Sequence, residues 1–281
     1  MIPSNIKYLK TRAVTDPGKR GRRNEDAYRL ETYEISEQDP TPVMLAVVAD
    51  GVGGHQAGEI ASALAIESVF SAFLENDLSD PIWALKSALL EANHSITAQA
   101  DSDDKQQGMG STIVVALIID YSLYVATLGD SRIYLIRDRA IQQLNIDHTW
   151  VQEAIENGVI TPDEARSHPR RHLIRSYLGS SDPIQPDLRL YLDSQETVEQ
   201  AKANQGLPLI PQDKLLLCSD GLSDLVTDEE ILNAVESMPD TQSMLQSLVD
   251  LANERGGHDN ITIILLTVPG EALFSSDLEE E

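Results

Sequence analysis

The sequence predicts an α+β domain in which helices lie outside a mostly antiparallel system of strands. Hydrophobic residues make up 41% and charged residues 24% of the 281, which is the composition of an ordinary globular protein. Apolar runs follow one another through the middle of the chain with links of only a few residues, and such short links require antiparallel pairing. Segments of helical periodicity precede and follow these runs, which indicates helix layers on the outside.

The N-terminal part contributes one clear strand and two helices. Residues 43–49 form a continuous apolar run that ends at Asp50, which is typical of a buried strand. A short glycine-rich turn follows, and apolar residues then recur at helical spacing from 56 to about 74. A second helix is predicted from Asp80 and Pro81, because Asp caps a helix and Pro fits its first turn.

The remaining strands are predicted in the centre and near the C-terminus. One helix capped by Thr227 and another from about 241 to 254 separate the last two strands. The predicted strands cover residues 113–119, 123–128, 133–136, 141–144, 215–219 and 261–268.

We expect a single domain over residues 1–270, followed by a frayed acidic tail over 271–281. Residues 147–185 are polar and basic, with helix-capping signals at Thr149 and Thr161. Residues 194–212 are polar and contain two prolines, which predicts a surface insertion.

The charge balance excludes several partners. Lys and Arg number 21 and Asp and Glu 46, so the formal net charge is −25. Such a chain repels nucleic acid and anionic membranes, and we expect neither as a partner. A single Cys excludes an intramolecular disulfide and fits a reducing compartment. No apolar run reaches the roughly 18 residues of a membrane span, and no signal-peptide stretch is present, so a cytoplasmic location is expected.

Four Asp residues stand at the ends of apolar runs: Asp50, Asp130, Asp220 and Asp259. Asp is common in turns, so each of them taken alone is equally well explained as a turn residue. If antiparallel pairing brings all four to one edge, their charges share a small volume, and cations must neutralise them or their pKa values must rise. Oxygen ligands suit hard ions such as Mg²⁺ or Mn²⁺ and not structural zinc.

Other catalytic chemistries lack their motifs. A thiol phosphatase loop needs an Arg six residues after its Cys, and Cys218 has Asp224 there, so Cys218 is expected to be a small core residue. The chain has no Gly-x-Ser-x-Gly elbow and no P-loop. The glycines at 51, 53 and 54 precede a helix and could cradle a phosphate, but the parallel βαβ pattern of a dinucleotide-binding fold is missing.

Seven short motifs occur between about Lys10 and Val268, and each of them is weak alone. They are Asn24-Glu25-Asp26, Val48-Ala49-Asp50-Gly51-Val52-Gly53-Gly54-His55, Gly110-Ser111-Thr112, Gly129-Asp130-Ser131-Arg132, Asp147-His148-Thr149, Ser219-Asp220-Gly221-Leu222 and Asp259-Asn260. In this order the set resembles the metal-dependent serine/threonine protein phosphatases of the PPM, or type 2C, family in their bacterial form.

The resemblance implies a four-layer α/β/β/α sandwich with two central, mostly antiparallel sheets. It also implies hydrolysis of phosphoserine and phosphothreonine on proteins with Mg²⁺ or Mn²⁺, with two ions per site and a third, weaker one. Two such ions can bridge a water and lower its pKa towards neutrality, and the hydroxide then attacks phosphorus in line. Residues 150–185 occupy the position of the family's flap, which borders the substrate groove.

The resemblance also assigns roles to individual residues. It implies that Asp50 bridges two ions and that Gly51 supplies a carbonyl ligand. It implies that Asp220 and Asp259 bind one of these ions and that Glu25 reaches the other partly through water. It further implies a third ion between Asp130 and Asp220, a His55 close to the metal site, and a His148 that braces the structure. The implied catalytic residues are Asp50, Asp220, Asp259 and His55.

One position departs from the family pattern. The family usually places a phosphate-binding Arg four residues before the Glu of its first motif, and here Gly21 stands at that position. We hypothesise that Arg20 or Arg22 reaches the phosphate through a shifted loop. A solvated basic turn is the equally good alternative.

Two other functions compete with the enzyme. One is a catalytically silent relative that binds phosphoproteins or serves as a regulatory scaffold, and the other is a structural cation-binding domain. Loss of metal ligands is the signature of silent members, and the five acidic positions are all retained here. For the enzyme, we expect phosphorylated proteins as substrates, a serine/threonine kinase of the same cell as the opposing activity, and a monomeric state.

Overall fold

The structure is a computed structural model that describes residues 1–4, 8–19, 23–53, 57–76 and 78–270 of the chain. Its strands form two sheets in which every neighbouring pair is antiparallel. The first sheet runs in the order β1 (Ile2–Pro3), β3 (Asp26–Glu34), β4 (Pro42–Val52), β6 (Ile113–Ile119), β7 (Ser122–Leu128) and β10 (Leu207–Pro208), with β5 (Gly110–Ser111) also paired to β4. The second runs in the order β2 (Lys10–Asp16), β12 (Ile261–Thr267), β11 (Lys214–Cys218), β8 (Arg132–Arg137) and β9 (Ala140–Gln143).

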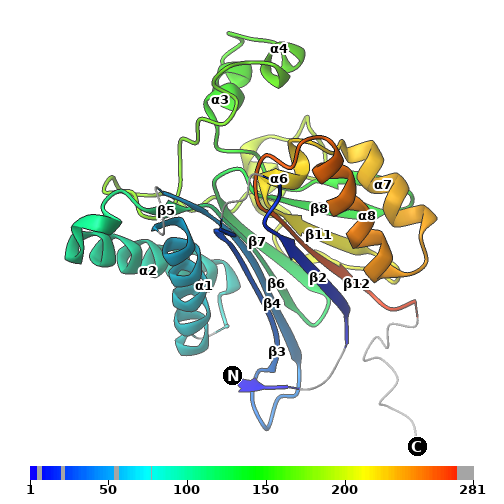
Figure 1. Ribbon diagram of the computed structural model, residues 1–281. Helices are drawn as coiled ribbons and strands as arrows, with labels where there is room; N and C mark the ends of the chain where they lie inside the picture. Colours follow the sequence, from blue (N-terminus) through cyan, green and yellow to red (C-terminus); the bar gives the residue numbers. More distant parts are fainter. Residues whose placement is uncertain (5–7, 20–22, 54–56, 77, 271–281) are drawn as a thin grey trace, which may run out of the picture.

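Helices cover the outer face of each sheet. Two long helices lie on the first sheet, α1 (Ala57–Glu75) and α2 (Pro81–Ser102), and α7 (Asp228–Ser237) and α8 (Thr241–Glu254) lie on the second (Figure 1). The predicted four-layer α/β/β/α sandwich is therefore confirmed. The shorter helices are η1 (Asp104–Gln106), α3 (Trp150–Glu156), α4 (Pro162–Arg166), α5 (Val198–Ala203) and α6 (Asp220–Ser223).

Burial on both faces explains why the central strands read as continuous apolar runs. Side chains alternate along a strand, and in β4 the set that includes Val47 packs under α1 and α2, whereas the set that includes Val48 packs between the two sheets. In β11, Leu215 faces the space between the sheets and Leu216 faces α7 and α8. Three apolar layers thus hold the four layers of the sandwich together.

The capping signals in the sequence mark real helix ends. Asp80 caps α2 by accepting a hydrogen bond from the Trp83 N–H at 3.0 Å. Thr161 and Thr227 both form capping boxes with a Glu three residues later. In contrast, β2 and β3 are strands that the sequence analysis did not predict, because their side chains are only partly buried and their apolar pattern is poor.

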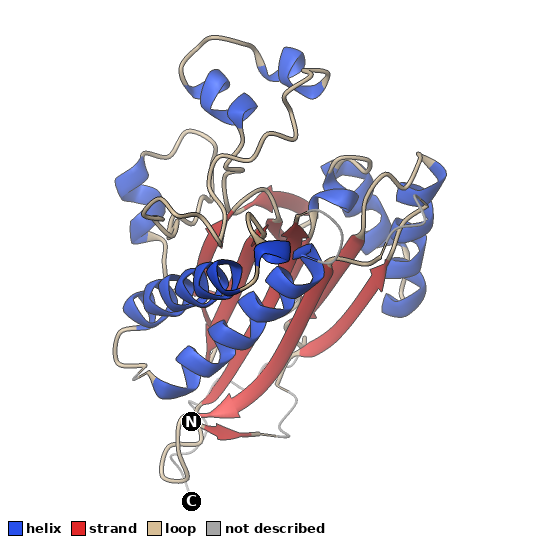
Figure 2. Cartoon of the chain, turned by 60° about the vertical axis from the view of Figure 1, so that its left-hand side comes forward, coloured by secondary structure: helices blue, strands red, loops and turns tan. Residues whose placement is uncertain are grey.

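Residues 150–185 contain the projecting segment expected at the flap. Helices α3 and α4 stand away from the sandwich in both views (Figures 1 and 2). The two ends of the segment lie side by side, because the Trp150 N–H donates to the Leu173 carbonyl at 2.9 Å and the Arg175 N–H donates to the His148 carbonyl at 2.7 Å. The flap is therefore tied to the body where it leaves and where it returns.

The predicted surface insertion over 194–212 needs a correction. Much of it is exposed, but it includes α5, and β10 adds an edge strand to the first sheet by pairing with β7. Leu207 and Leu209 are buried in the layer between the sheets. Leu207 and Leu209 flank Pro208, and an apolar pattern of two residues is too short to predict that they belong to the core.

Helix α1 is long and apolar enough to cross a membrane by length and composition alone. It packs instead on the first sheet, where Ala61, Phe70 and Phe73 are buried. Its apolar character follows from this core position.

Candidate metal centre and active site

The ends of several strands meet at one edge of the sandwich and carry the predicted acidic residues there. Asp50 lies near the end of β4, opposite Asp26 of β3 in the sheet register. Asp220 stands two residues after the end of β11, as the first residue of α6, and Asp259 precedes β12. A cleft of about 440 Å³ opens at this edge and is lined by Glu25, Asp50, Gly51, Asp220 and Asp259, among others. Of the four carboxylates expected to converge, the structure brings Asp50, Asp220 and Asp259 into one cleft, and Asp130 lies near enough to act electrostatically on Asp50 and Asp220.

Burial and mutual repulsion dominate the electrostatics of this edge. Burial raises the pKa of Asp50 and of Asp220 well above the usual range, and the neighbouring carboxylates raise both further. Burial likewise raises the pKa of Asp130 to about 7 and, against hydrogen bonds that oppose the shift, the pKa of Asp26 to about 6. So many acidic groups in one place are stable at neutral pH only with added protons or with cations.

Buried carboxylate oxygens that lack hydrogen-bond partners are candidate ligands for cations at this edge. The Oδ1 atoms of Asp130 and Asp220 are buried, and neither has a hydrogen-bond partner among the described residues. The acidic side chains that line the cleft offer carboxylate oxygens, which suit Mg²⁺ or Mn²⁺. The residues at this edge therefore fit a divalent-ion site.

Glu25 is held in place through its backbone. Its N–H donates to Asn260 Oδ1 at 2.7 Å, and its carbonyl accepts hydrogen bonds from the Gly51 N–H at 3.2 Å and from Ser62 Oγ at 2.5 Å. Ser62 belongs to α1, so both the neighbouring strand and the helix fix the position of Glu25.

Gly58, in the first turn of α1, makes room for Glu25 and Gly51. A Cβ atom at position 58 would lie 2.8 Å from Glu25 Cδ and 2.8 Å from the Gly51 carbonyl oxygen. Real Cβ atoms do not approach other atoms so closely, and a side chain here would displace two candidate ligands. Gly58 was not predicted as a site residue from the sequence, although a glycine just after a glycine-rich turn suggests a close approach of neighbouring backbone.

Asn260 joins the strand ends to the loop before β3. Its Nδ2 donates to the Pro17 carbonyl at 3.0 Å and to the Arg23 carbonyl at 3.3 Å. Its own N–H donates to Asp259 Oδ1 at 2.9 Å, which orients that carboxylate. The Asp259-Asn260 pair therefore supplies one acidic group and one side chain that holds the backbone at Pro17 and at Arg23.

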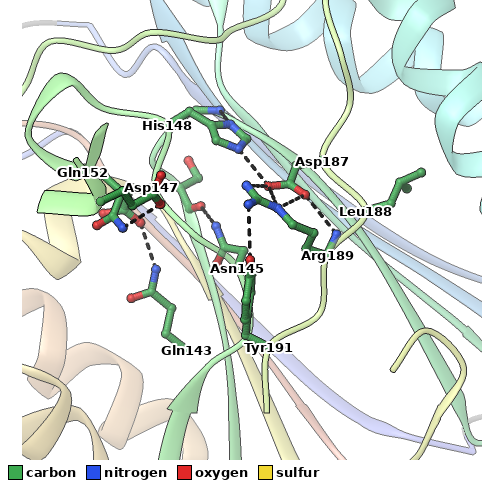
Figure 3. Close-up of polar contacts among 12 residues, drawn as sticks. Gln143, Asn145, Asp147, His148, Gln152, Asp187, Leu188, Arg189 and Tyr191 are labelled. Carbon is green, nitrogen blue, oxygen red and sulfur yellow. Dashed lines mark hydrogen bonds and ion pairs between the residues drawn. The ribbon is translucent and has the colours of Figure 1, made fainter. Parts of the chain in front are cut away.

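His148 braces the loop that carries Asp130, as the sequence analysis predicted. Its ring Nδ1 accepts a hydrogen bond from the Gly129 N–H at 3.1 Å, and its backbone N–H donates to the Gly129 carbonyl at 2.9 Å. Because Nδ1 accepts, the proton is on Nε2, which lies 3.1 Å from Asp187 Oδ2 (Figure 3). Gly129 has a φ of +106°, a conformation that other residues rarely adopt.

Asp187 completes this brace and was not found from the sequence. Although burial alone would raise the pKa of Asp187, hydrogen bonds from His148 and Arg189 hold it well below its ordinary value. Arg189 binds the Asp187 carboxylate through Nε and Nη2, and its Nη1 donates to the Tyr191 hydroxyl (Figure 3). The residue lies in an irregular stretch where no motif marks it.

The flap contributes basic side chains to the lining of the cleft. Arg171 and His172 both border it, together with the acidic side chains. His172 Nδ1 lies 3.0 Å from Asp224 Oδ2, and one ligand atom from each of His172, Asp220 and Asp224 lies within 4.8 Å of the others. Asp224 stands four residues after Asp220, a helical spacing that could have drawn attention to it.

Three predicted site residues, Arg20, Arg22 and His55, lie outside the described residues. Arg23, the third Arg of that loop, is described, and its Nη1 lies 3.2 Å from Glu59 Oε2 in α1. Cys218 is fully buried, and burial raises the pKa of its thiol to about 12, so it is the inert core residue that was expected.

Comparison with known proteins decides the family. A family model described as "Protein phosphatase 2C" matches residues 17–154. The protein phosphatase PhpP of Streptococcus pneumoniae is 34% identical over 260 residues, covering 92% of this chain and 97% of that protein. The chain belongs to the protein phosphatase 2C family.

Other members of the family support the same assignment. The serine/threonine protein phosphatase PstP of Mycobacterium tuberculosis is 38% identical over 226 residues, covering 80% of this chain. The match spans only 40% of PstP's own length. The serine/threonine phosphatase of S. agalactiae superposes with a TM-score of 0.79 at 31% identity, covering 93% of this chain and all of that one. The catalytic domain of PstP in complex with two manganese ions superposes with a TM-score of 0.73 at 32% identity, covering 93% of this chain and 98% of that one.

Proposed function

We propose that this chain is a protein serine/threonine phosphatase that hydrolyses phosphoserine and phosphothreonine with the help of Mg²⁺ or Mn²⁺. The observation that carries the proposal is the group of buried carboxylates, with unpartnered oxygens on Asp130 and Asp220, at one edge of a protein phosphatase 2C fold. A scaffold without a catalytic role would have no use for so many buried negative charges.

The acidic residues would hold the ions in the arrangement that the family resemblance implies. Asp50 and the Gly51 carbonyl would help to hold two ions, Asp220 and Asp259 would bind one of them, and Glu25 would reach the other partly through water. Asp130, together with Asp220, would hold a third. Bound ions supply positive charge to the phosphate oxygens and make a water acidic enough to attack phosphorus at neutral pH.

The remaining residues position the ligands and the substrate. Asn260 and Gly58 keep Glu25 in place, and His148 keeps the loop of Asp130 in place. No side-chain nucleophile is needed, which agrees with the inert Cys218. Arg20 or Arg22 would contact the phosphate, and His55 would lie near the ions.

The substrates we propose are phosphorylated proteins, with a serine/threonine kinase of the same cell as the opposing enzyme. A net charge of −25 supports the absence of nucleic-acid and membrane partners. We also propose a cytoplasmic location and a monomeric state.

The experiment is hydrolysis of p-nitrophenyl phosphate and of a phosphothreonine peptide by the purified chain. Hydrolysis should require Mn²⁺ or Mg²⁺, stop with excess chelator, and return when the metal is restored. Saturable binding of phosphopeptide without turnover at any metal concentration would instead favour a silent regulatory relative.

A further inference from the structure

The cleft beside the proposed metal centre has an unequal distribution of charge. Its acidic side chains come from the sandwich, and they include Glu25, Asp50, Asp220 and Asp259. Among the described residues, the one arginine that lines it is Arg171, which lies in a turn where the flap returns to the body. Once divalent ions offset the carboxylates, an arginine in this position would be the protein's own cation facing a bound anion.

The arginines next to Arg171 are engaged elsewhere. Arg170 lies over the Trp150 ring, with 5.0 Å between its Cζ and the ring centroid. Arg175 pairs with Glu153 of α3, with 3.1 Å between its Nε and the Glu153 Oε2. The guanidinium of Arg171 is exposed and has no ion pair within 4 Å among the described residues, so it is available to a ligand.

The backbone of Arg171 is fixed although its side chain is exposed. Its N–H donates to the His168 carbonyl at 3.0 Å, and two residues further on the Leu173 N–H donates to the Arg170 carbonyl at 3.1 Å. The neighbouring His172 contacts Asp224, next to the acidic centre, with 3.0 Å between its Nδ1 and the Asp224 Oδ2. These contacts hold position 171 at the cleft.

We propose that Arg171 binds the phosphoryl oxygens of the substrate from the flap side of the cleft, in addition to the contact proposed for Arg20 or Arg22. A guanidinium presents paired N–H groups that match phosphate oxygens, which makes Arg better suited to this contact than Lys. The proposal rests on the proposed function, because it gives Arg171 a role in substrate binding by that same site.

The test compares the wild type with Arg171→Ala, Arg171→Lys and Arg175→Ala. Arg175 lies in the same flap and is also an exposed arginine, but it is paired with Glu153 away from the cleft. Three quantities are measured for each protein: the KM and the kcat for p-nitrophenyl phosphate, and the dissociation constant of inorganic phosphate by isothermal titration calorimetry in Mg²⁺.

For Arg171→Ala we expect KM and the phosphate dissociation constant to rise together by about tenfold, the weight of one charge-assisted hydrogen bond. The kcat should change by less than about twofold, because the contact is already made in the ground state. Arg171→Lys should recover part of the loss, and Arg175→Ala should behave as the wild type. Parallel loss in Arg175→Ala would mean a general disturbance of the flap and would overturn the assignment.

Two further results would also overturn it. One is an unchanged phosphate dissociation constant in Arg171→Ala. The other is a KM that rises for a phosphopeptide but not for p-nitrophenyl phosphate, which would indicate contact with the peptide rather than the phosphoryl group. A wild type that binds phosphate through Arg171 but hydrolyses nothing would instead refute the proposed function alone.

Discussion

Replacing Asp130 with Asn should stabilise the metal-free protein at pH 8. Asp130 is 6% exposed, and burial raises its pKa from 3.8 to about 7. Each pKa unit corresponds to about 1.36 kcal/mol, so keeping this group charged in the folded state costs about 4 kcal/mol. Because Asn recovers only part of this cost of burying a charge, we expect the free energy of unfolding to rise by about 2–4 kcal/mol, or Tm by roughly 4–8 °C.

The pH dependence of this effect has a definite sign. A carboxyl group whose pKa is raised by folding contributes its full stability below the unfolded value of 3.8 and loses it as pH rises through about 7. The advantage of Asp130→Asn should therefore be small near pH 4, grow up to about pH 7 and stay constant above.

The assay is thermal unfolding followed by circular dichroism, in chelator, at several pH values from 4 to 8. Asp101→Asn is the matched control, because Asp101 is an exposed carboxylate on α2 and should leave Tm unchanged. In saturating Mn²⁺ the wild type should gain more stability than Asp130→Asn does. A variant that is less stable than the wild type at pH 8 in chelator, or an advantage that does not change with pH, would refute the reasoning.

Four other substitutions test three separate parts of the site. Asp50→Asn or Asp220→Asn should abolish hydrolysis while circular dichroism shows an intact fold, because a ligand is lost but its volume is kept. Gly58→Ala should weaken Mn²⁺ binding by about tenfold in calorimetry, since the new methyl group displaces candidate ligands. His148→Ala should lower the free energy of unfolding in urea by about 1–3 kcal/mol, because it leaves the Gly129 N–H without its ring acceptor and removes one of the hydrogen bonds to the Asp187 carboxylate.

A specific result would contradict the expected effect of each substitution. Turnover near the wild-type value in Asp50→Asn or Asp220→Asn at saturating Mn²⁺ would contradict the ligand assignment. Unchanged Mn²⁺ affinity in Gly58→Ala would mean that the contact with Glu25 is irrelevant to the metal. A His148→Ala protein as stable as the wild type would show that the brace contributes nothing.

The layers of the fold could be predicted because burial leaves a strong pattern. Runs such as 43–49 are apolar at every position, since one face packs on helices and the other on the second sheet. Capping residues such as Thr161 and Thr227 form specific hydrogen bonds over three residues, so short local patterns identify them. Strands β2 and β3 escaped prediction because they are only partly buried, and β10 because it is two residues long.

The site could be predicted as a set of acidic residues but not as a working arrangement. Asp50 and Asp220 stand out because a charge at the end of a buried strand needs an explanation. Asp187 and Gly58 carry no such signal, because their roles depend on contacts with residues far away in the chain. The part of the flap that faces the cleft, with Arg171, follows only from the folded path of the chain.

The central claim is that this cluster of carboxylates binds divalent ions, and calorimetric titration of the metal-free chain with Mn²⁺ tests it most directly. We predict saturable binding of at least two ions per chain, with at least one of these sites lost in Asp50→Asn. No saturable binding, or an identical titration curve for Asp50→Asn, would contradict it.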